Sequence, residues 1–239
     1  MKTATRDFWD NRFTAAAESP ETQREKKAVV ERACAWLGDI RGKRVLDLGC
    51  GAGVSSLALA EKGAHVVALD ASSEGIKRLK HQCAVRGLTN VEMIVGDAMG
   101  IDRVGPFDCI VGLMILHHIE PFELFVERMR KSLNAGGKAF FWENNAVPLL
   151  MWFRNHVVGR YWVPKKGDAD ESPLSCGELD VLRHYFTVHI EHRELYLFRL
   201  ISLYLLRNKL KSTFSKIDEV AYRIPALHQW SYRQYIMID

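Results

Sequence analysis

From residue 43 to residue 142, two patterns of apolar and polar positions alternate along the chain. Short apolar runs predict buried strands, and longer stretches with apolar residues three or four positions apart predict helices. Strands joined by helices need crossover connections, so this alternation predicts a parallel sheet with helices on both faces. The predicted strands are Val45–Leu48, His65–Leu69, Val91–Val95, Phe107–Gly112 and Lys138–Trp142; the predicted helices are Val54–Lys62, one capped by Ser72 or Ser73 that ends near Gly87, and Pro121–Leu133, which leads into a turn at 134–137.

The pattern differs on both sides of this region. Ser19 followed by Pro20 predicts the start of a helix, because Ser caps free N–H groups and Pro is tolerated in the first turn; Gly38 predicts its end. After Glu143 the alternation stops. The predictions there are an irregular helical insertion over 146–176, a strand over Phe186–Leu195, a strongly apolar helix over Leu197–Leu210 and a closing edge strand over Tyr232–Ile238.

Composition narrows the class of protein. The chain has 239 residues with a net charge of +4, from 33 basic and 29 acidic residues, and this excess is too small and scattered to favour a nucleic-acid partner. The first ten residues are polar and mixed in charge, unlike a signal peptide. No apolar run approaches the roughly 18 residues that span a bilayer. We therefore expect a soluble, cytoplasmic protein.

The cysteines favour neither a disulfide framework nor a metal site. An odd number of widely spaced cysteines without a C-x-x-C pair is typical of reduced thiols in a cytoplasm, and we expect no metal. The five are Cys34, Cys50, Cys83, Cys109 and Cys176.

A glycine-rich loop lies directly after the first predicted strand and before a helix. It reads Asp47-Leu48-Gly49-Cys50-Gly51-Ala52-Gly53. Glycine lets the backbone turn sharply and approach a ligand, and the following helix offers unpaired N–H groups. Asp70 ends the second strand and Asp97 follows the third. Because the carboxyl ends of parallel strands share one edge of the sheet, we expect one ligand there, with Asp70 accepting from ribose hydroxyls and Asp97 from an adenine amino group.

Dinucleotide binding is the main rival interpretation of this loop. Residues 51–56 read GAGVSS, which nearly fits G-x-G-x-x-G/A, but Ser56 replaces the third small residue. A loop in which the glycines serve only a tight turn is a second alternative. The two aspartates at the ends of later strands argue against it.

Residues 44–119 resemble the class I S-adenosylmethionine-dependent methyltransferases. The matching stretches are VLDLGCGAG, VVALDAS, GDA at 96–98 and FDCIVGLMILHHI at 107–119. The resemblance implies a doubly wound, mostly parallel seven-stranded sheet with an antiparallel last strand. The N-terminal Phe8-Trp9-Asp10 is similar to the start of small-molecule members, in which an aromatic helix closes over the cofactor.

The resemblance also implies the cofactor, S-adenosylmethionine, and how it is held. In the family the glycine loop borders the methionine part, the residue matching Asp70 holds the ribose and the residue matching Asp97 holds the adenine. We expect one domain, with a helical cap (1–40), a cofactor-binding core (41–145), a lid-like insertion (146–180) and C-terminal strands with an apolar helix (181–239). The expected cofactor-binding residues are Asp47, Gly49, Cys50, Gly51, Gly53, Asp70, Ala71, Asp97, Ala98 and Leu113.

Methyl transfer needs mainly the alignment of donor and acceptor, to which a general base adds when the acceptor is a hydroxyl. His117 and His118 follow the fourth strand, and Glu143 follows the fifth beside Asn144 and Asn145. A histidine titrates near neutral pH, so these three are the catalytic candidates. The alternatives are that the histidines only shape the pocket floor and that the amides only form a turn. Clustered histidines slightly favour O over N or C as the methylated atom.

Residues 195–206 read LYLFRLISLYLL and are followed by Arg207, Lys209 and Lys211. A buried helix is the favoured interpretation. The alternative is a basic, apolar surface that meets lipid or a lipid-like acceptor. The sequence thus favours a methyltransferase acting on a small molecule, ahead of one acting on a lipid-like acceptor at a membrane surface and of a non-catalytic module that binds the cofactor or a partner.

Overall fold

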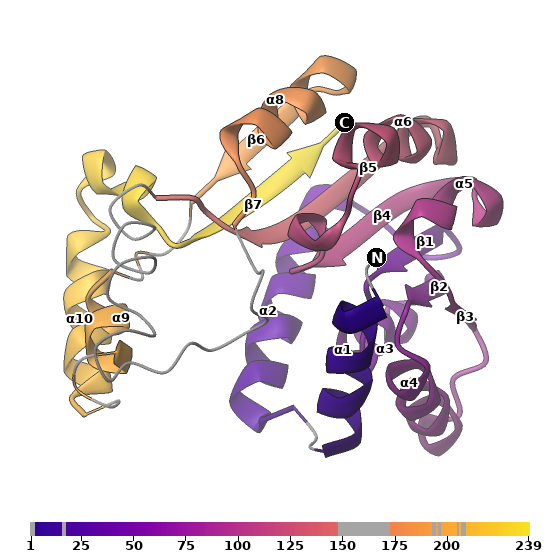
Figure 1. Ribbon diagram of the computed structural model, residues 1–239, viewed down its shortest axis with the longest axis horizontal. Helices are drawn as coiled ribbons and strands as arrows, with labels where there is room; N and C mark the ends of the chain where they lie inside the picture. Colours follow the sequence, from indigo (N-terminus) through magenta and orange to yellow (C-terminus); the bar gives the residue numbers. More distant parts are fainter. Residues whose placement is uncertain are drawn as a thin grey trace.

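The computed structural model describes residues 3–15, 18–147, 173–192, 195, 197–204, 206 and 209–239. Its centre is a seven-stranded sheet of order β3-β2-β1-β4-β5-β7-β6 (Figure 1). Strands β1 to β5 are parallel, and β7 is antiparallel to both β5 and β6. This confirms the predicted doubly wound sheet. The strands are β1 (Arg44–Leu48), β2 (His65–Asp70), β3 (Val91–Val95), β4 (Phe107–Leu113), β5 (Leu133–Asn144), β6 (Val188–Glu191) and β7 (Arg233–Ile238).

Helices cover both faces of the sheet. Apolar residues of α2, α3 and α4 are buried against one face, and those of α5, α6 and α8 against the other. Helix α1 lies against α4, near the carboxyl ends of the first strands (Figure 1). The helices are α1 (Thr3–Ala15), α2 (Pro20–Leu37), α3 (Val54–Glu61), α4 (Ser73–Arg86), α5 (Ile101–Val104), α6 (Phe122–Ser132), α8 (Cys176–Tyr185), α9 (Leu197–Tyr204) and α10 (Lys211–Ala221), with short 3-10 turns η1 (Ala98–Gly100), η2 (Leu116–His118) and η3 (Pro225–Trp230).

The helix ends predicted from capping residues are confirmed. The Ser19 hydroxyl accepts a hydrogen bond from the Thr22 N–H at 3.2 Å, and α2 ends before Gly38. The Ser72 hydroxyl accepts from the Gly75 N–H at 3.1 Å at the start of α4, which ends before Gly87. A side-chain oxygen that satisfies an orphan N–H stabilises a helix start by about 1 kcal/mol.

The expectation that Tyr232–Ile238 closes the edge of the sheet is wrong. Strand β7 lies between β5 and β6, with Ile236 paired to Phe141 on one side and to Ile190 on the other. Residues 236–238 are buried, as an interior strand requires. The short strand β6 takes the edge instead, and its lower share of buried positions matches that place.

The turn expected at 134–137 is a bulge inside a long strand. Phe107 pairs with Leu133 and Cys109 pairs with Lys138. An advance of two residues along β4 therefore corresponds to an advance of five residues along β5. Gly136 has φ +72°, a left-handed conformation that glycine adopts without steric cost. The prediction failed because glycine in the left-handed conformation is typical of both β-bulges and turns.

The C-terminal third differs most from expectation. Among the described residues, the strand predicted over 186–195 corresponds to β6 and the helix predicted over 197–210 corresponds to α9. Helix α10 was not predicted, because Asp218 occupies its buried face and hides the apolar period. Of the lid-like insertion over 146–180, residues 148–172 lie outside the described residues. The division of the chain into four segments stays a prediction.

Candidate active site

The glycine loop after β1 needs its glycines for space as well as for conformation. Gly49 and Gly51 have φ of +68° and +53°, in the left-handed region that residues with a side chain rarely adopt. A Cβ on Gly49 would lie 2.6 Å from the Ile115 side chain, and one on Gly51 would lie 2.9 Å from the Phe13 ring. The loop is therefore packed between the segment after β4 and helix α1.

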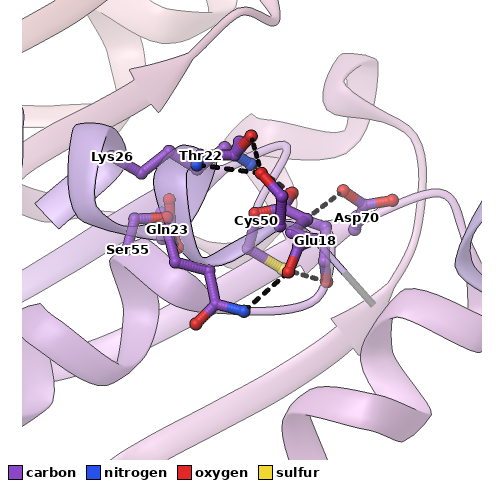
Figure 2. A network of polar contacts seen from close by, with 10 residues as sticks. Glu18, Thr22, Gln23, Lys26, Cys50, Ser55 and Asp70 are labelled. Atoms are coloured by element: carbon purple, nitrogen blue, oxygen red, sulfur yellow. Dashed lines mark hydrogen bonds and ion pairs between the residues drawn. The ribbon is translucent and has the colours of Figure 1, made fainter. Parts of the chain in front are cut away.

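The carboxylate of Asp70 is held against this loop. Its Oδ2 accepts from the Gly51 N–H at 2.7 Å (Figure 2). Its Oδ1 accepts from the Ser72 N–H at 2.8 Å. Burial raises the pKa of Asp70, and the two backbone hydrogen bonds oppose that rise. Two residues that are 19 positions apart thus meet at one point of the sheet edge.

Asp97 lies at the matching point after β3. Its Oδ1 accepts from the Met99 N–H at 2.8 Å and caps η1. This bond fixes the carboxylate at the cavity wall beside Ala98. Leu69, Gly96 and Asp97 also border a second hollow of about 350 Å³.

One cavity of about 110 Å³ lies where the carboxyl ends of β1, β2 and β4 meet the segment after β3. Eight of the predicted site residues line it. They are Gly49, Gly51, Asp70, Ala71, Asp97, Ala98, Leu113 and His118. Five others do not line it: Asp47, Cys50, Gly53, His117 and Glu143. The structure therefore places the loop and both strand-end aspartates around one space.

Asp47 is fully buried behind the loop. Its Oδ2 accepts hydrogen bonds from the hydroxyls of Ser55, at 2.7 Å, and Ser56, at 2.5 Å. Its Oδ1 is buried and has no hydrogen-bond partner among the residues that the structure describes. Burial raises the pKa of Asp47 to about 6, although the two hydroxyls oppose the rise.

We expect Asp47 to make the protein less stable as the pH rises. The folded-state pKa of about 6 exceeds the usual aspartate pKa of 3.8, so between these pH values the folded state binds more protons than the unfolded state. The free energy of unfolding should then fall by about 2–3 kcal/mol between pH 4 and pH 6 through this group alone. Urea unfolding at several pH values, compared between the wild type and Asp47→Asn, measures this contribution. A stability difference that does not change with pH would contradict the assignment.

Cys50 lies inside the loop and is 3% exposed. Burial raises the pKa of its thiol well above the usual value, and its Sγ lies 3.8 Å from the Gly51 carbonyl oxygen. A neutral thiol in this place packs like a small apolar side chain.

An ion pair that the sequence did not reveal closes one side of the cavity. Lys26 Nζ lies 2.6 Å from Glu18 Oε1, and both residues line the cavity (Figure 2). Glu18 precedes α2, and Lys26 lies within α2. The spacing of apolar residues in this helix predicts only which face is buried against the sheet. No sequence signal distinguishes Lys26 from the other lysines of this helix.

Helix α1 covers the cavity with aromatic rings, in line with the expectation from Phe8-Trp9-Asp10. Trp9 stacks on Phe13 at 5.8 Å between centroids and meets the His118 ring edge-on at 6.0 Å. Asp10 Oδ1 accepts from the Ser72 hydroxyl at 2.5 Å, which ties α1 to α4. The enclosed space of about 110 Å³ is smaller than the roughly 300–1,000 Å³ typical of ligand sites.

The two histidines after β4 face different surroundings. His117 Nδ1 lies 2.6 Å from Glu143 Oε2, and both side chains are at most 1% exposed. Glu143 Oε1 accepts from the N–H groups of Ile115 and Leu116 at 2.8 and 2.7 Å. His118 instead lines the cavity, 4.1 Å from the His117 ring. Glu143 thus holds the segment after β4 in place from behind.

The two asparagines after Glu143 also bind the chain itself. The Asn145 side-chain N–H donates to the Ser231 main-chain carbonyl at 3.0 Å, and the main-chain carbonyl of Asn144 accepts from the Gln234 side chain at 3.2 Å. These bonds join the end of β5 to the start of β7.

Comparison with known proteins agrees with this geometry. The family model of a methyltransferase domain matches residues 45–137. Ubiquinone biosynthesis O-methyltransferases of Idiomarina loihiensis and Xylella fastidiosa are each 33% identical to this chain, over 58% and 64% of it and 58% and 63% of their own lengths. The chain thus spans about three fifths of the length of these curated relatives.

Solved structures match the fold over a greater length. Magnesium protoporphyrin IX methyltransferase from Synechocystis, with bound SAH, superposes with a TM-score of 0.66 at 16% identity and covers 100% of this chain and 99% of that one. Residues 45–137 match the family model of a methyltransferase domain, and the strand order of the sheet around them is that of the class I fold. The resemblance found in the sequence is confirmed.

Proposed function

We propose that this protein transfers a methyl group from S-adenosylmethionine to a small molecule, with a hydroxyl oxygen as the favoured acceptor. The observation that carries the proposal is the single cavity that the glycine loop, Asp70 and Asp97 border together. Three chain segments far apart in sequence supply one wall of it. A loop that served only as a tight turn would not need Asp70 bonded across to it at 2.7 Å.

The residues at the cavity fit this cofactor. Asp70 would hold the ribose, Asp97 and Ala98 the adenine, and Gly49 and Gly51 the methionine part, whose carboxylate Lys26 would meet in place of Glu18. The buried Asp47 Oδ1, which has no hydrogen-bond partner within the described residues, adds negative charge behind the loop. A cationic ligand is stabilised by nearby carboxylates.

When bound, the cofactor supplies a methyl group already activated by the positively charged sulfur. The chain has to orient the acceptor against it and exclude water, and orientation is worth roughly 7–11 kcal/mol of barrier. Trp9 and Phe13 of α1 form an apolar cover for this purpose. His118 is the titratable ring at the cavity wall, while the neighbouring His117 is held by Glu143 behind it.

The names of the relatives support an oxygen acceptor. Ubiquinone biosynthesis O-methyltransferases at 33% identity transfer methyl groups to oxygen, as their name states. A hydrophobic or lipid-like acceptor is the second candidate, because the C-terminal helices expose apolar side chains. The acceptor in either case is a small molecule.

Calorimetric titration with S-adenosylmethionine and with S-adenosylhomocysteine tests cofactor binding directly. Incubation with radiolabelled cofactor and small-molecule extracts of the host then identifies the labelled acceptor. Binding without transfer to any extract would favour a non-catalytic binding module. Uptake of a nicotinamide dinucleotide without S-adenosylmethionine would contradict the proposal.

We expect His118→Gln to lower kcat for a hydroxyl acceptor by about 10²-fold, because a general base contributes roughly 10²–10⁴-fold. The loss should shrink as the pH rises and the acceptor ionises without help. His184→Gln, a change on α8 outside the cavity, is the matched control. Full activity of His118→Gln at neutral pH would remove it as a base.

A further inference from the structure

Helices α9 and α10 lie side by side and form a helical hairpin at one end of the molecule, away from the strands (Figure 1). Of the eight large apolar side chains that are exposed in the described residues, five belong to this hairpin and the turn after it. They are Ile201 (36% exposed), Leu210 (62%), Ile217 (40%), Val220 (61%) and Ile224 (53%). Scattered single apolar residues are ordinary on a surface, whereas a group of five is not. We call these five residues the apolar face.

The inward side of α10 is already occupied. The Asp218 carboxylate accepts hydrogen bonds from the N–H groups of Phe198, at 2.9 Å, and Arg199, at 2.8 Å, and so caps the start of α9. Ile217 and Val220 are three residues apart in α10, which places them on one side of the helix, and Ile224 follows in the turn after it. Since the polar contact with α9 uses the other side, the apolar side of α10 points to solvent.

Leu210 is in an unfavourable place for a leucine in three respects. It is 62% exposed, its φ of +62° lies in the left-handed region, and it takes the N-cap position of α10 without a side-chain hydrogen bond. Asn or Gly would suit this conformation, and Asn, Asp or Ser would cap the helix. The local backbone conformation and the helix cap therefore do not explain why a leucine is present here.

Exposed basic residues are sequence neighbours of the apolar face. Lys209, Lys216 and Arg223 directly precede Leu210, Ile217 and Ile224, and Glu219 is the acidic residue exposed among them. Arg199 and Lys211 pair with Glu21 in the first turn of α2, at 3.3 and 2.5 Å, and so fasten the hairpin to the helix that carries Lys26 of the cavity. An excess of positive charge around apolar side chains complements an anionic, apolar surface.

We propose that the apolar face docks on a phospholipid bilayer that contains anionic lipids. None of the helices within the described part of the chain has the length and apolar composition to cross a bilayer. An interfacial contact needs neither, because the apolar side chains enter the boundary of the acyl chains while the basic ones meet headgroups. A second copy of this chain is a poorer occupant, since a twofold contact would bring Lys216 and Arg223 against like charges.

Sedimentation with vesicles tests the proposal, using the whole protein with phosphatidylcholine alone and with an equimolar mixture of phosphatidylcholine and phosphatidylglycerol. We expect binding to the mixed vesicles that weakens with salt, and little binding to phosphatidylcholine. Val220→Ser should lower the partition coefficient by about fivefold or more, whereas Val85→Ser, on α4 and 69% exposed, should leave it unchanged. Lys216→Gln should lower it by about fivefold, and Lys80→Gln on α4 by less.

Leu210→Asn separates docking from folding. It removes an apolar side chain but suits the left-handed N-cap position, so the melting temperature should stay the same or rise while vesicle binding falls. Wild-type protein that ignores mixed vesicles would overturn the proposal, and so would equal losses in Val220→Ser and Val85→Ser. A concentration-dependent dimer that Val220→Ser abolishes, without vesicle binding, would assign the face to a second copy.

The proposal does not rest on the methyltransferase activity. Titration with S-adenosylhomocysteine on the same preparations reports the cavity, and vesicle binding reports the hairpin. Retained cofactor binding with failed sedimentation would reject the docking surface alone, and the reverse result would reject the proposed function alone.

Discussion

Replacing Asp70 with Ala should weaken the binding of S-adenosylmethionine by about 10²–10⁴-fold. Two charge-assisted hydrogen bonds to the ribose would be lost, and each is worth roughly 1.5–3 kcal/mol. The carboxylate is already oriented, because the N–H groups of Gly51 and Ser72 hold it at 2.7 and 2.8 Å. Its replacement therefore removes both a ligand contact and the bond that fixes the glycine loop. Calorimetric titration measures the change in Kd.

Two variants separate these effects. Asp70→Asn keeps one acceptor oxygen for a backbone N–H and should bind more tightly than Asp70→Ala but more weakly than the wild type. Asp102→Ala, on α5 and outside the cavity, is the control for loss of an aspartate. Unchanged affinity in a folded Asp70→Ala protein would reject the cofactor assignment, because no other residue in the second strand offers an acceptor at this place.

Replacing Glu143 with Ala should cost about 3–5 kcal/mol of folding free energy. Three donors, the N–H groups of Ile115 and Leu116 and the ring of His117, would lose their acceptor in a buried place. Removing one partner of a buried, hydrogen-bonded charge has this typical cost. Urea unfolding gives the free energy, and a drop in melting temperature of roughly 6–20 °C is the matching thermal result.

Two further variants should lose less stability than Glu143→Ala. Glu92 on β3 has an exposed carboxylate that pairs with Arg44 at 3.2 Å. Glu92→Ala should lower the free energy of unfolding by about 1 kcal/mol or less. Glu143→Gln retains an oxygen for the backbone donors, so its loss of folding free energy should lie between those of Glu143→Ala and Glu92→Ala. If Glu143→Ala abolishes methyl transfer while its melting temperature is unchanged, Glu143 acts on the acceptor and does not support the segment after β4.

The core of the fold and the wall of the cavity could be predicted because their sequence signals are local. Gly49 and Gly51 are required by backbone conformation, and Asp70 and Asp97 end predicted strands, so the topology of a parallel sheet brings them to one edge. The caps Ser19 and Ser72 are equally local, since a single hydrogen bond decides where each helix starts.

The remaining features depend on the orientation of side chains and on contacts between residues that are distant in the sequence. His117 and His118 are neighbours in sequence, yet one turns toward the buried Glu143 and the other toward the cavity. Lys26 reaches the cavity from a helix whose pattern reports only its buried side. Helix α10 was missed because Asp218, a capping residue for another helix, interrupts its apolar period.

The interior position of β7 has a consequence for how the sheet is made in the cell. Among the described residues β6 pairs with β7 alone, and β7 is the partner of β5 on that side, so this edge of β5 is unpaired until Arg233–Ile238 is available. A nascent or stalled chain that lacks these residues exposes the backbone groups of β5 to other chains, beside the apolar side chains of residues 139–142. Chaperones that shield strand edges would therefore act on this protein between the synthesis of residue 144 and that of residue 238.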